Sequence, residues 1–107
     1  MPRRTNLDLD LVRAFLVVCE QRSFTRAGER LGRSQSAVSL QVRRLEEQLG
    51  QPLLSRDPRH VSPTEQGAAF LPQARRLLRL NDEILASLGA DEIEGEVRLG
   101  APEDFAT

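Results

Sequence analysis

The sequence of 107 residues contains no tryptophan, no tyrosine, one histidine and one cysteine. The single cysteine, Cys19, cannot form an internal disulfide, and no cluster of cysteines and histidines has the spacing of a metal site. The chain also lacks a nucleophile paired with a base, which catalysis commonly uses. Its acidic run, Asp91, Glu92, Glu94 and Glu96, is most simply a solvated linker. These absences predict a chain that is not an enzyme, has no metal or cofactor of its own and suits a reducing cytoplasm.

Long hydrophobic runs are absent as well. No stretch approaches the roughly 20 consecutive apolar residues that a membrane-spanning helix needs. Asp8 and Asp10 interrupt the region in which an export signal would require an apolar core. At 107 residues the chain fits one compact domain. We therefore expect a soluble cytoplasmic protein with no membrane partner.

Lysine is missing too, so every basic residue is an arginine. The net charge of -1 conceals an uneven distribution. Residues 1–60 hold eleven arginines against seven acidic residues, a net charge of +4, whereas the remainder holds four against nine, a net charge of -5. Such asymmetry is typical of a chain in which one part meets an anion. Arginine also suits bidentate contacts to phosphate and guanine.

Apolar periodicity predicts three helices in the first half of the chain. The first covers residues 9–20 and has one apolar face, formed by Val12, Phe15, Leu16 and Cys19. A second helix is expected between an N-cap at Ser23 and a stop at Gly32, and a third between Ser34 and Gly50. Because only a short turn with a glycine separates the last two, the pattern indicates a helix-turn-helix.

The pattern changes after Gly50. The pair Asp57-Pro58 separates two short stretches, residues 53–56 and 59–62, which predicts a small β-hairpin, or wing. A long helix is expected from Pro63-Thr64 to about residue 88, followed by a linker at residues 89–91 and a strand from residue 96. In this long helix, residues at alternating steps of four and three form a row typical of the seam of a coiled coil. The row consists of five apolar residues and one asparagine, namely Phe70, Ala74, Leu77, Asn81, Ile84 and Leu88.

A second apolar row lies beside this seam, at Leu71, Leu78 and Leu85. A helix with so wide an apolar arc is not stable alone in water. One row is therefore expected to pack on the body of the domain while the other meets a second copy of the chain.

Four motifs occur in a specific order along the chain. They are Arg22-Ser23-Phe24-Thr25-Arg26-Ala27, residues 31–50 (LGRSQSAVSLQVRRLEEQLG), Leu53-Leu54-Ser55-Arg56 and Thr64-Glu65-Gln66-Gly67. Together they strongly resemble the N-terminal half of LysR-type transcriptional regulators over about residues 7–88. Residues 95–101 (GEVRLGA) are similar to the first strand of that family's effector-binding domain. The chain departs from the family pattern at Gly28, where alanine is usual, and at Leu40, where a basic or polar residue is common.

The resemblance implies a mainly α fold. It consists of a winged helix-turn-helix (residues 1–64), a linker and dimerisation helix (65–89) and a hinge with the first strand of a truncated effector-binding domain (90–107). It further implies sequence-specific binding of double-stranded DNA by a bacterial regulator, as a homodimer on an interrupted palindromic operator. The intact regulator would form tetramers and bind a small-molecule effector. If position 28 is exposed on its helix, glycine there lowers the stability of the helix by up to ~1 kcal/mol relative to alanine.

A recognition helix presents its N-terminal residues to base edges in the major groove. The residues expected nearest the bases are Gln35, Ser36, Ala37, Ser39 and Leu40. Those expected at phosphates are Ser23, Thr25, Arg26, Ser34, Gln41, Arg43 and Arg44. On the wing, Arg56 and Arg59 are expected at the minor groove.

Simpler interpretations stay open for several of these residues. Arg43 and Arg44 can pair with Glu46 and Glu47 on a solvated helix face. Ser23 and Ser34 can be N-caps with no further role. Arg56 can pack on the body, and Asn81 is either tolerated or sets the dimer register. Cys19 is expected to be a core residue without a positive neighbour. The alternative function is that of a winged-helix module that binds protein, which the polar, arginine-rich face of the third helix disfavours.

Overall fold

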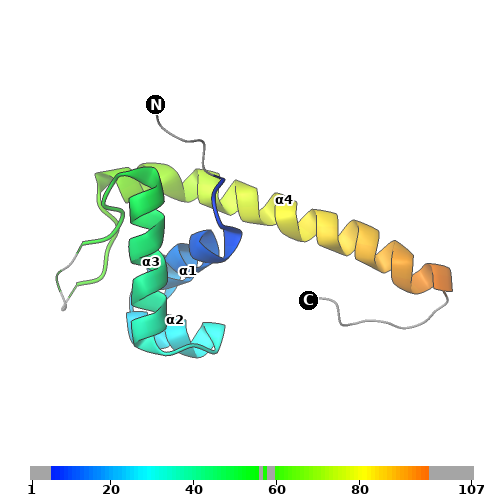
Figure 1. Ribbon diagram of the computed structural model, residues 1–107, viewed down its shortest axis with the longest axis horizontal. Helices are drawn as coiled ribbons and strands as arrows, with labels where there is room; N and C mark the ends of the chain where they lie inside the picture. Colours follow the sequence, from blue (N-terminus) through cyan, green and yellow to red (C-terminus); the bar gives the residue numbers. More distant parts are fainter. Residues whose placement is uncertain (1–5, 56, 58–59, 97–107) are drawn as a thin grey trace. The chain divides into compact units, whose positions relative to one another are not determined.

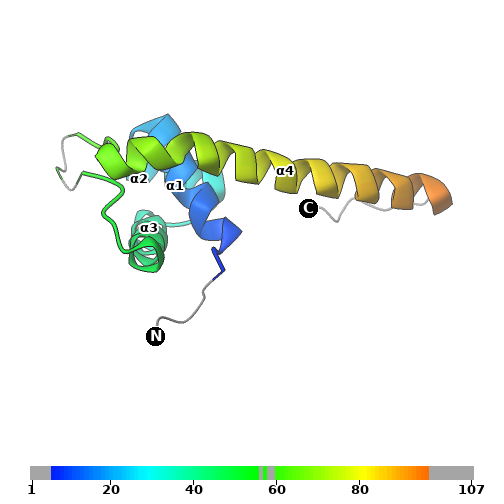
Figure 2. The ribbon, with the colours of Figure 1, turned by 90° about the horizontal axis from the view of Figure 1, so that it is seen from above.

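The computed structural model describes residues 6–55, 57 and 60–96, and it describes side-chain surroundings as far as Gly89. In these residues the fold is mainly helical, with α1 (Leu9–Gln21), α2 (Phe24–Leu31), α3 (Gln35–Leu49) and α4 (Glu65–Glu96). Helices α1, α2 and α3 contact one another pairwise. Figure 1 shows α3 crossing in front of α1, and Figure 2 views α3 nearly along its axis. The three predicted helices of the first half are thus confirmed.

Local capping explains where α2 and α3 begin and end. Ser23 Oγ accepts the Arg26 N–H at 3.0 Å, and Ser34 Oγ accepts the Ala37 N–H at 3.1 Å, so each serine satisfies one free donor at a helix start. Gly32 and Gly50 end α2 and α3 in the left-handed conformation, with φ of 69° and 70°. These signals act within one helical turn, and they are therefore readable from the sequence.

The core of the first three helices consists of aliphatic and aromatic side chains that are at most 7% exposed. Phe15 is fully buried in this core, and its ring centroid is 5.7 Å from that of Phe70 on α4. The apolar face predicted for α1 is only partly correct, because Leu16 and Cys19 are half-buried while Leu11, Ala14 and Val18 are buried.

Gly28 has a structural role that the sequence did not reveal. The residue is buried, and a Cβ placed on it would lie 2.5 Å from the Arg33 carbonyl oxygen. The Arg33 N–H in turn donates to the Gly28 carbonyl at 2.8 Å. The predicted loss of up to ~1 kcal/mol of helix stability assumed an exposed position, so it does not apply to the buried Gly28. Instead, glycine allows the turn between α2 and α3 to approach the α2 backbone closely.

The predicted hairpin wing is not seen in the described residues. They contain one isolated antiparallel bridge, Leu54 with Pro63, flanked by hydrogen bonds from Ser55 N to Ser62 O (2.8 Å) and from Thr64 N to Leu53 O (3.0 Å). The ladder does not continue through the Leu53 N–H, because that group donates to Glu46 Oε2 at 2.8 Å. A side chain of α3 therefore takes the place of a strand partner. The expected turn lies partly outside the described residues.

Helix α4 begins where the sequence predicted and continues farther. Thr64 caps it by accepting the Gly67 N–H at 3.0 Å, while its hydroxyl donates to Pro52 O at 2.6 Å. The expected end near residue 88 is wrong, because the helix runs through Gly89 to Glu96. A single glycine costs a helix only about 1 kcal/mol, which is too little to end one of this length. The strand expected from residue 96 is not seen at Glu96, which is helical, and its remaining residues lie outside the described part.

The chain divides into two units, Met1–Arg75 and Arg76–Thr107, and the division falls within α4. Phe70 packs on Phe15 and Ala74 is fully buried, so the first turns of α4 belong to the first unit. The expected domain boundaries stay a prediction.

Candidate nucleic-acid interface

An open hollow of about 370 Å³ lies among the N-terminal ends of α2 and α3 and the loop that follows α3. We call it the α2–α3 hollow. Its lining residues are Arg22, Ser23, Phe24, Thr25, Gln35, Ser39, Arg43, Ser55, Asp57 and Val61. Five of them were singled out in the sequence, namely Ser23, Thr25, Gln35, Ser39 and Arg43. The fold thus brings together two residues expected at bases and three expected at phosphates.

Two helix N-termini meet at this part of the surface. Free N–H groups at a helix start and the positive end of its dipole favour an anion such as phosphate. Ser23 and Ser34 act as N-caps, as the simpler interpretation held, and Ser34 is exposed. Thr25 and Arg26, in the first turn of α2, are exposed as well. The arrangement suits a phosphate on chemical grounds even where a serine also caps its helix.

The outer face of α3 carries most of the residues expected at bases. Gln35 and Ser36 are exposed, and Leu40 is 46% exposed although it is a large apolar side chain. Ser39 is half-buried at the edge of the α2–α3 hollow. Ala37 is also half-buried, so part of its surface faces the core.

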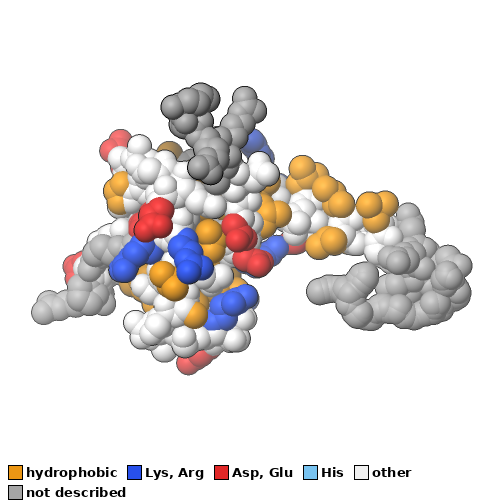
Figure 3. All heavy atoms as spheres, viewed as in Figure 1, with side chains coloured by type: hydrophobic (Ala, Val, Ile, Leu, Met, Phe, Trp, Pro, Cys, Tyr) orange, Lys and Arg blue, Asp and Glu red, His pale blue; other side chains and the backbone are white. Residues whose placement is uncertain are grey.

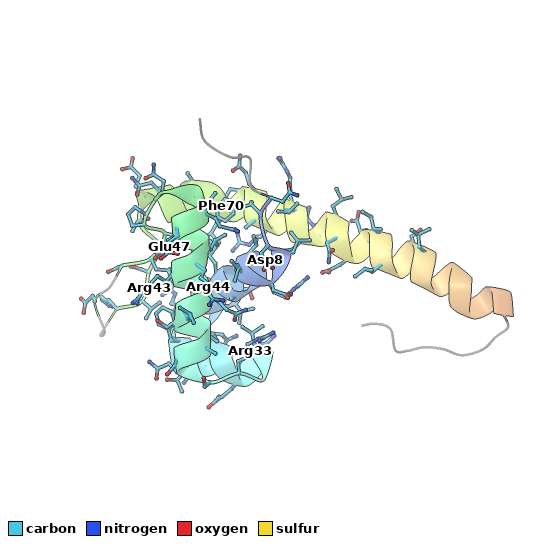
Figure 4. The ribbon with its side chains drawn as sticks, viewed as in Figure 1. Asp8, Arg33, Arg43, Arg44, Glu47 and Phe70 are labelled. Carbon is cyan, nitrogen blue, oxygen red and sulfur yellow. The ribbon has the colours of Figure 1, made fainter. Side chains whose placement is uncertain are left out.

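The polar residues farther along α3 differ in their placement. Arg43 and Arg44 are both exposed, but only Arg43 lines the hollow. Figure 4 shows both arginines on α3, with Glu47 farther along the helix and Arg33 near its opposite end. Figure 3 shows basic and acidic side chains next to one another over this helix. Gln41 is half-buried, and its Oε1 has no hydrogen-bond partner in the described part of the chain.

Arg56 and Arg59 lie outside the described residues, so their expected place at the wing stays a prediction. Sequence reasoning missed Arg22 and Ser55, which both line the hollow. Ser55 comes from the loop after α3, and its Oγ accepts the Asp57 N–H at 3.3 Å. Arg22 stands next to the cap Ser23 and begins the first of the four motifs, and these were the signals that could have singled it out in the sequence.

The residues expected at a dimer seam fall into three groups. Phe70 and Ala74 pack within the chain itself, and Leu77 and Asn81 are half-buried. The remaining two are exposed, Ile84 to 49% and Leu88 to 64%. Leu80 and Leu85, which the seam did not include, are 55% and 59% exposed. Figure 3 shows such apolar side chains along α4.

Cys19 is half-buried, and burial raises the pKa of its thiol to about 11. The expectation that it has no positive neighbour is wrong, because the charge of Arg75 lowers this pKa and that of Glu20 raises it. Burial is the larger effect, so the thiol stays protonated near neutral pH. Among the described residues, no group of His, Cys, Asp or Glu side chains could hold a metal ion. None of the helices found in that part is long and apolar enough to cross a membrane.

Comparison with solved structures places this geometry among DNA-binding domains. The BenM DNA-binding domain in complex with catB site 1 DNA has a TM-score of 0.75 and 35% identity, covering 80% of this chain and 96% of that one. Vibrio fischeri DarR in complex with DNA has a TM-score of 0.73 and 26% identity, covering 80% and 30%.

Curated relatives agree. The transcriptional regulator DgdR of Burkholderia cepacia is 44% identical over 101 residues, which are 94% of this chain and 34% of DgdR. PecT of Dickeya dadantii is 45% identical over 101 residues, which are 94% of this chain and 32% of PecT. The chain therefore spans about a third of the length of these relatives, which are regulators rather than enzymes. The family model of the bacterial regulatory helix-turn-helix proteins of LysR type matches residues 9–68, and because this is more than half of the sequence, the chain belongs to the LysR family.

Proposed function

We propose that the chain binds double-stranded DNA in a sequence-specific manner, as the DNA-binding part of a transcriptional regulator. The observation that carries this proposal is the α2–α3 hollow, which collects five residues of the types and positions that a DNA-binding helix-turn-helix uses. The DNA complexes of BenM and DarR, whose folds are similar, support it further.

In the proposed complex α3 lies in the major groove. Gln35 meets base edges, where glutamine pairs in a bidentate manner with adenine, and Leu40 can contact a thymine methyl group. Thr25 and Arg43 bind phosphates on either side and set the register of α3 without reading sequence. A thymine methyl group would thus provide the apolar contact that exposed Leu40 lacks within the chain.

The test is selection of bound sequences from a pool of random duplexes, followed by affinity measurements at several salt concentrations. If a dimer neutralises about 6–10 phosphates, affinity falls by roughly 10³ to 10⁵ between about 50 and 200 mM salt. Gln35→Ala is expected to cost ~1–3 kcal/mol and to relax the preference at one position of each half-site. Gln48→Ala is the matched control, because Gln48 is exposed near the other end of α3. A flat salt dependence, or no selected sequence, would contradict DNA binding and favour a protein-binding module.

We further propose that the chain acts as a homodimer on an interrupted palindromic operator, and that the intact regulator forms tetramers and responds to a small-molecule effector. Exposed Leu80, Ile84, Leu85 and Leu88 support the dimer, because a patch of large apolar side chains is typical of an interface. A two-fold related operator would follow from the symmetry of that dimer.

A further inference from the structure

A second open hollow, of about 640 Å³, lies beside the first one, within the unit Met1–Arg75. We call it the basic hollow. The end of α1, the loop before α4 and the early turns of α4 form its walls. Its lining residues are Cys19, Arg22, His60, Val61, Ser62, Pro63, Leu71 and Arg75. None of these residues except Arg22 and Val61 belongs to the α2–α3 hollow.

The polar groups of these lining residues are suited to an anion. Arg22 and Arg75 are exposed guanidinium groups, His60 donates an N–H in any protonation state, and Ser62 provides a hydroxyl donor. No carboxylate is among the described residues that line the hollow. Glu20 acts electrostatically on the nearby Cys19 thiol, but it does not line the hollow. The site therefore combines positive charge with hydrogen-bond donors, which is the chemistry that recognises phosphate.

Arg22 has an unusual backbone for an arginine. Its φ of 56° is left-handed, whereas the other left-handed residues in the described part of the chain are glycines, Gly32 and Gly50. Its N–H closes α1 by donating to Val18 O at 2.7 Å. A glycine would make the same bond without the steric cost of a side chain. The arginine at this position is therefore not explained by the end of α1, and its side chain lines both hollows.

The two hollows adjoin, because Arg22 and Val61 line both of them. We propose that the basic hollow binds a phosphate group of the DNA backbone, next to the phosphates bound at α2 and α3, with Arg22 and Arg75 as its main ligands. The inference rests on the proposed function, because it extends the DNA contact beyond the helix-turn-helix. A free phosphate ester has the same chemistry, but the shared lining residues Arg22 and Val61 place the basic hollow next to the α2–α3 hollow, which favours the duplex.

Two variants remove the proposed ligands without placing strain on the fold. Arg22→Gly puts the residue that suits a left-handed φ at the end of α1, so the variant is expected to be at least as stable as the parent chain. Arg75→Ala puts a strong helix former at an exposed helix position. Arg76→Ala is the matched control, because Arg76 is the exposed neighbour of Arg75 and does not line the hollow.

The experiment measures affinity and salt dependence of the 107-residue chain on its selected duplex, together with interference by ethylated phosphates. Arg75→Ala is expected to lower affinity roughly tenfold or more. It is also expected to reduce the salt slope by about 0.9 for each phosphate that is no longer neutralised. One phosphate per half-site should lose its interference, and this phosphate should differ from those affected by Thr25→Ala or Arg43→Ala. Arg22→Gly should lower affinity as well, and Arg76→Ala should leave both quantities unchanged.

Other outcomes would overturn the inference. If the parent chain binds its duplex and Arg75→Ala binds it equally well with the same salt slope, the basic hollow has no part in DNA binding, while the proposed function stands. If inorganic phosphate at millimolar concentration shifts the NMR signals of Arg22 and Arg75 but DNA affinity is unchanged in the variants, the hollow serves a small phosphate instead of the duplex. Failure of the parent chain to bind any duplex would reject the proposed function itself, and the inference with it.

Discussion

A methyl group at Gly67 would collide with the Leu53 carbonyl oxygen, whereas a methyl group at Gly89 would meet no atom within 4 Å. Both glycines belong to α4, Gly67 in its first turn and Gly89 in its interior, and alanine has the higher helix propensity at either position. Gly67→Ala is nevertheless expected to destabilise the chain by ~1–3 kcal/mol, because a backbone must shift to make room. Gly89→Ala is expected to stabilise it by roughly 0.5–1 kcal/mol. Urea unfolding of both variants checks this pair, and a stabilising Gly67→Ala would show that the close approach does not exist.

Leu40 is the residue at which specificity can be redirected. It is 46% exposed on α3, so its side chain is available to a partner. If it contacts a thymine methyl group, Leu40→Arg should shift the preferred base toward guanine, because the guanidinium pairs with O6 and N7. Leu40→Ala should weaken the preference at the same position without creating a new one. Selection from random duplexes checks both variants. The same preferred site for the parent and both variants would mean that α3 is placed differently on DNA.

At the scale of elements, Glu46 connects α3 to the loop that follows it. Its carboxylate oxygen Oε2 accepts the Leu53 N–H at 2.8 Å and the Leu54 N–H at 3.2 Å. Its main-chain oxygen accepts the N–H groups of Gly50 and Gln51. Leu53 and Leu54 are only 1% and 2% exposed, so no water can easily replace the carboxylate. One side chain thereby holds the start of the loop that supplies Ser55 to the α2–α3 hollow.

Glu46→Ala is therefore expected to destabilise the chain by about 1–3 kcal/mol for each buried N–H that it leaves without a partner. Glu46→Gln retains an oxygen acceptor and should show a smaller loss. Glu47→Ala is the control, because Glu47 is exposed on the same helix, and its effect should lie within about 0.5 kcal/mol of zero. Thermal unfolding measures the three variants. Equal stability of Glu46→Ala and Glu47→Ala would mean that the loop is held by other contacts.

The prediction of a hairpin shows why this element was harder to read than the helices. Turn residues and short apolar stretches are local signals, and they indicated two strands. Whether backbone groups pair across a hairpin depends on what else they can bond to. Here Glu46, seven positions before Leu53 in the sequence, takes the N–H that would continue the ladder. No local sequence pattern predicts such a competing hydrogen-bond acceptor.

At the scale of the whole molecule, the exposed apolar residues of α4 predict association of two copies. Replacing Ile84 and Leu88 together by aspartate would place charges in this patch. Both residues are exposed, so the fold of each chain should be retained while the dimer is lost. We expect monomers by sedimentation velocity and weaker operator binding, because the two half-sites would no longer be bound by one particle.

Arg79→Glu is the control for this double variant. Arg79 is exposed, and at 100° per residue it lies on the side of α4 opposite the seam. This variant should remain a dimer. A double variant that sediments like the parent chain would place the interface between copies elsewhere.

Local sequence patterns were enough to specify the three helices α1, α2 and α3, their ends, and the family to which the chain belongs. They also indicated which face of α3 is polar, because capping, glycine stops and helical periodicity all act over a few residues. Those patterns were sufficient to single out Gln35, Ser39 and Arg43 as one face of a helix.

Tertiary contacts were needed to establish which groups meet across longer separations. They pack Phe70 against Phe15 and bury Ala74 within the chain itself, and they require glycine at positions 28 and 67 because another segment approaches each of them. They also place Arg22, which follows α1, where it lines both the α2–α3 hollow and the basic hollow. The physical reason is the same in each case. Close packing and hydrogen-bond competition depend on segments that are distant in the sequence and adjacent only after folding.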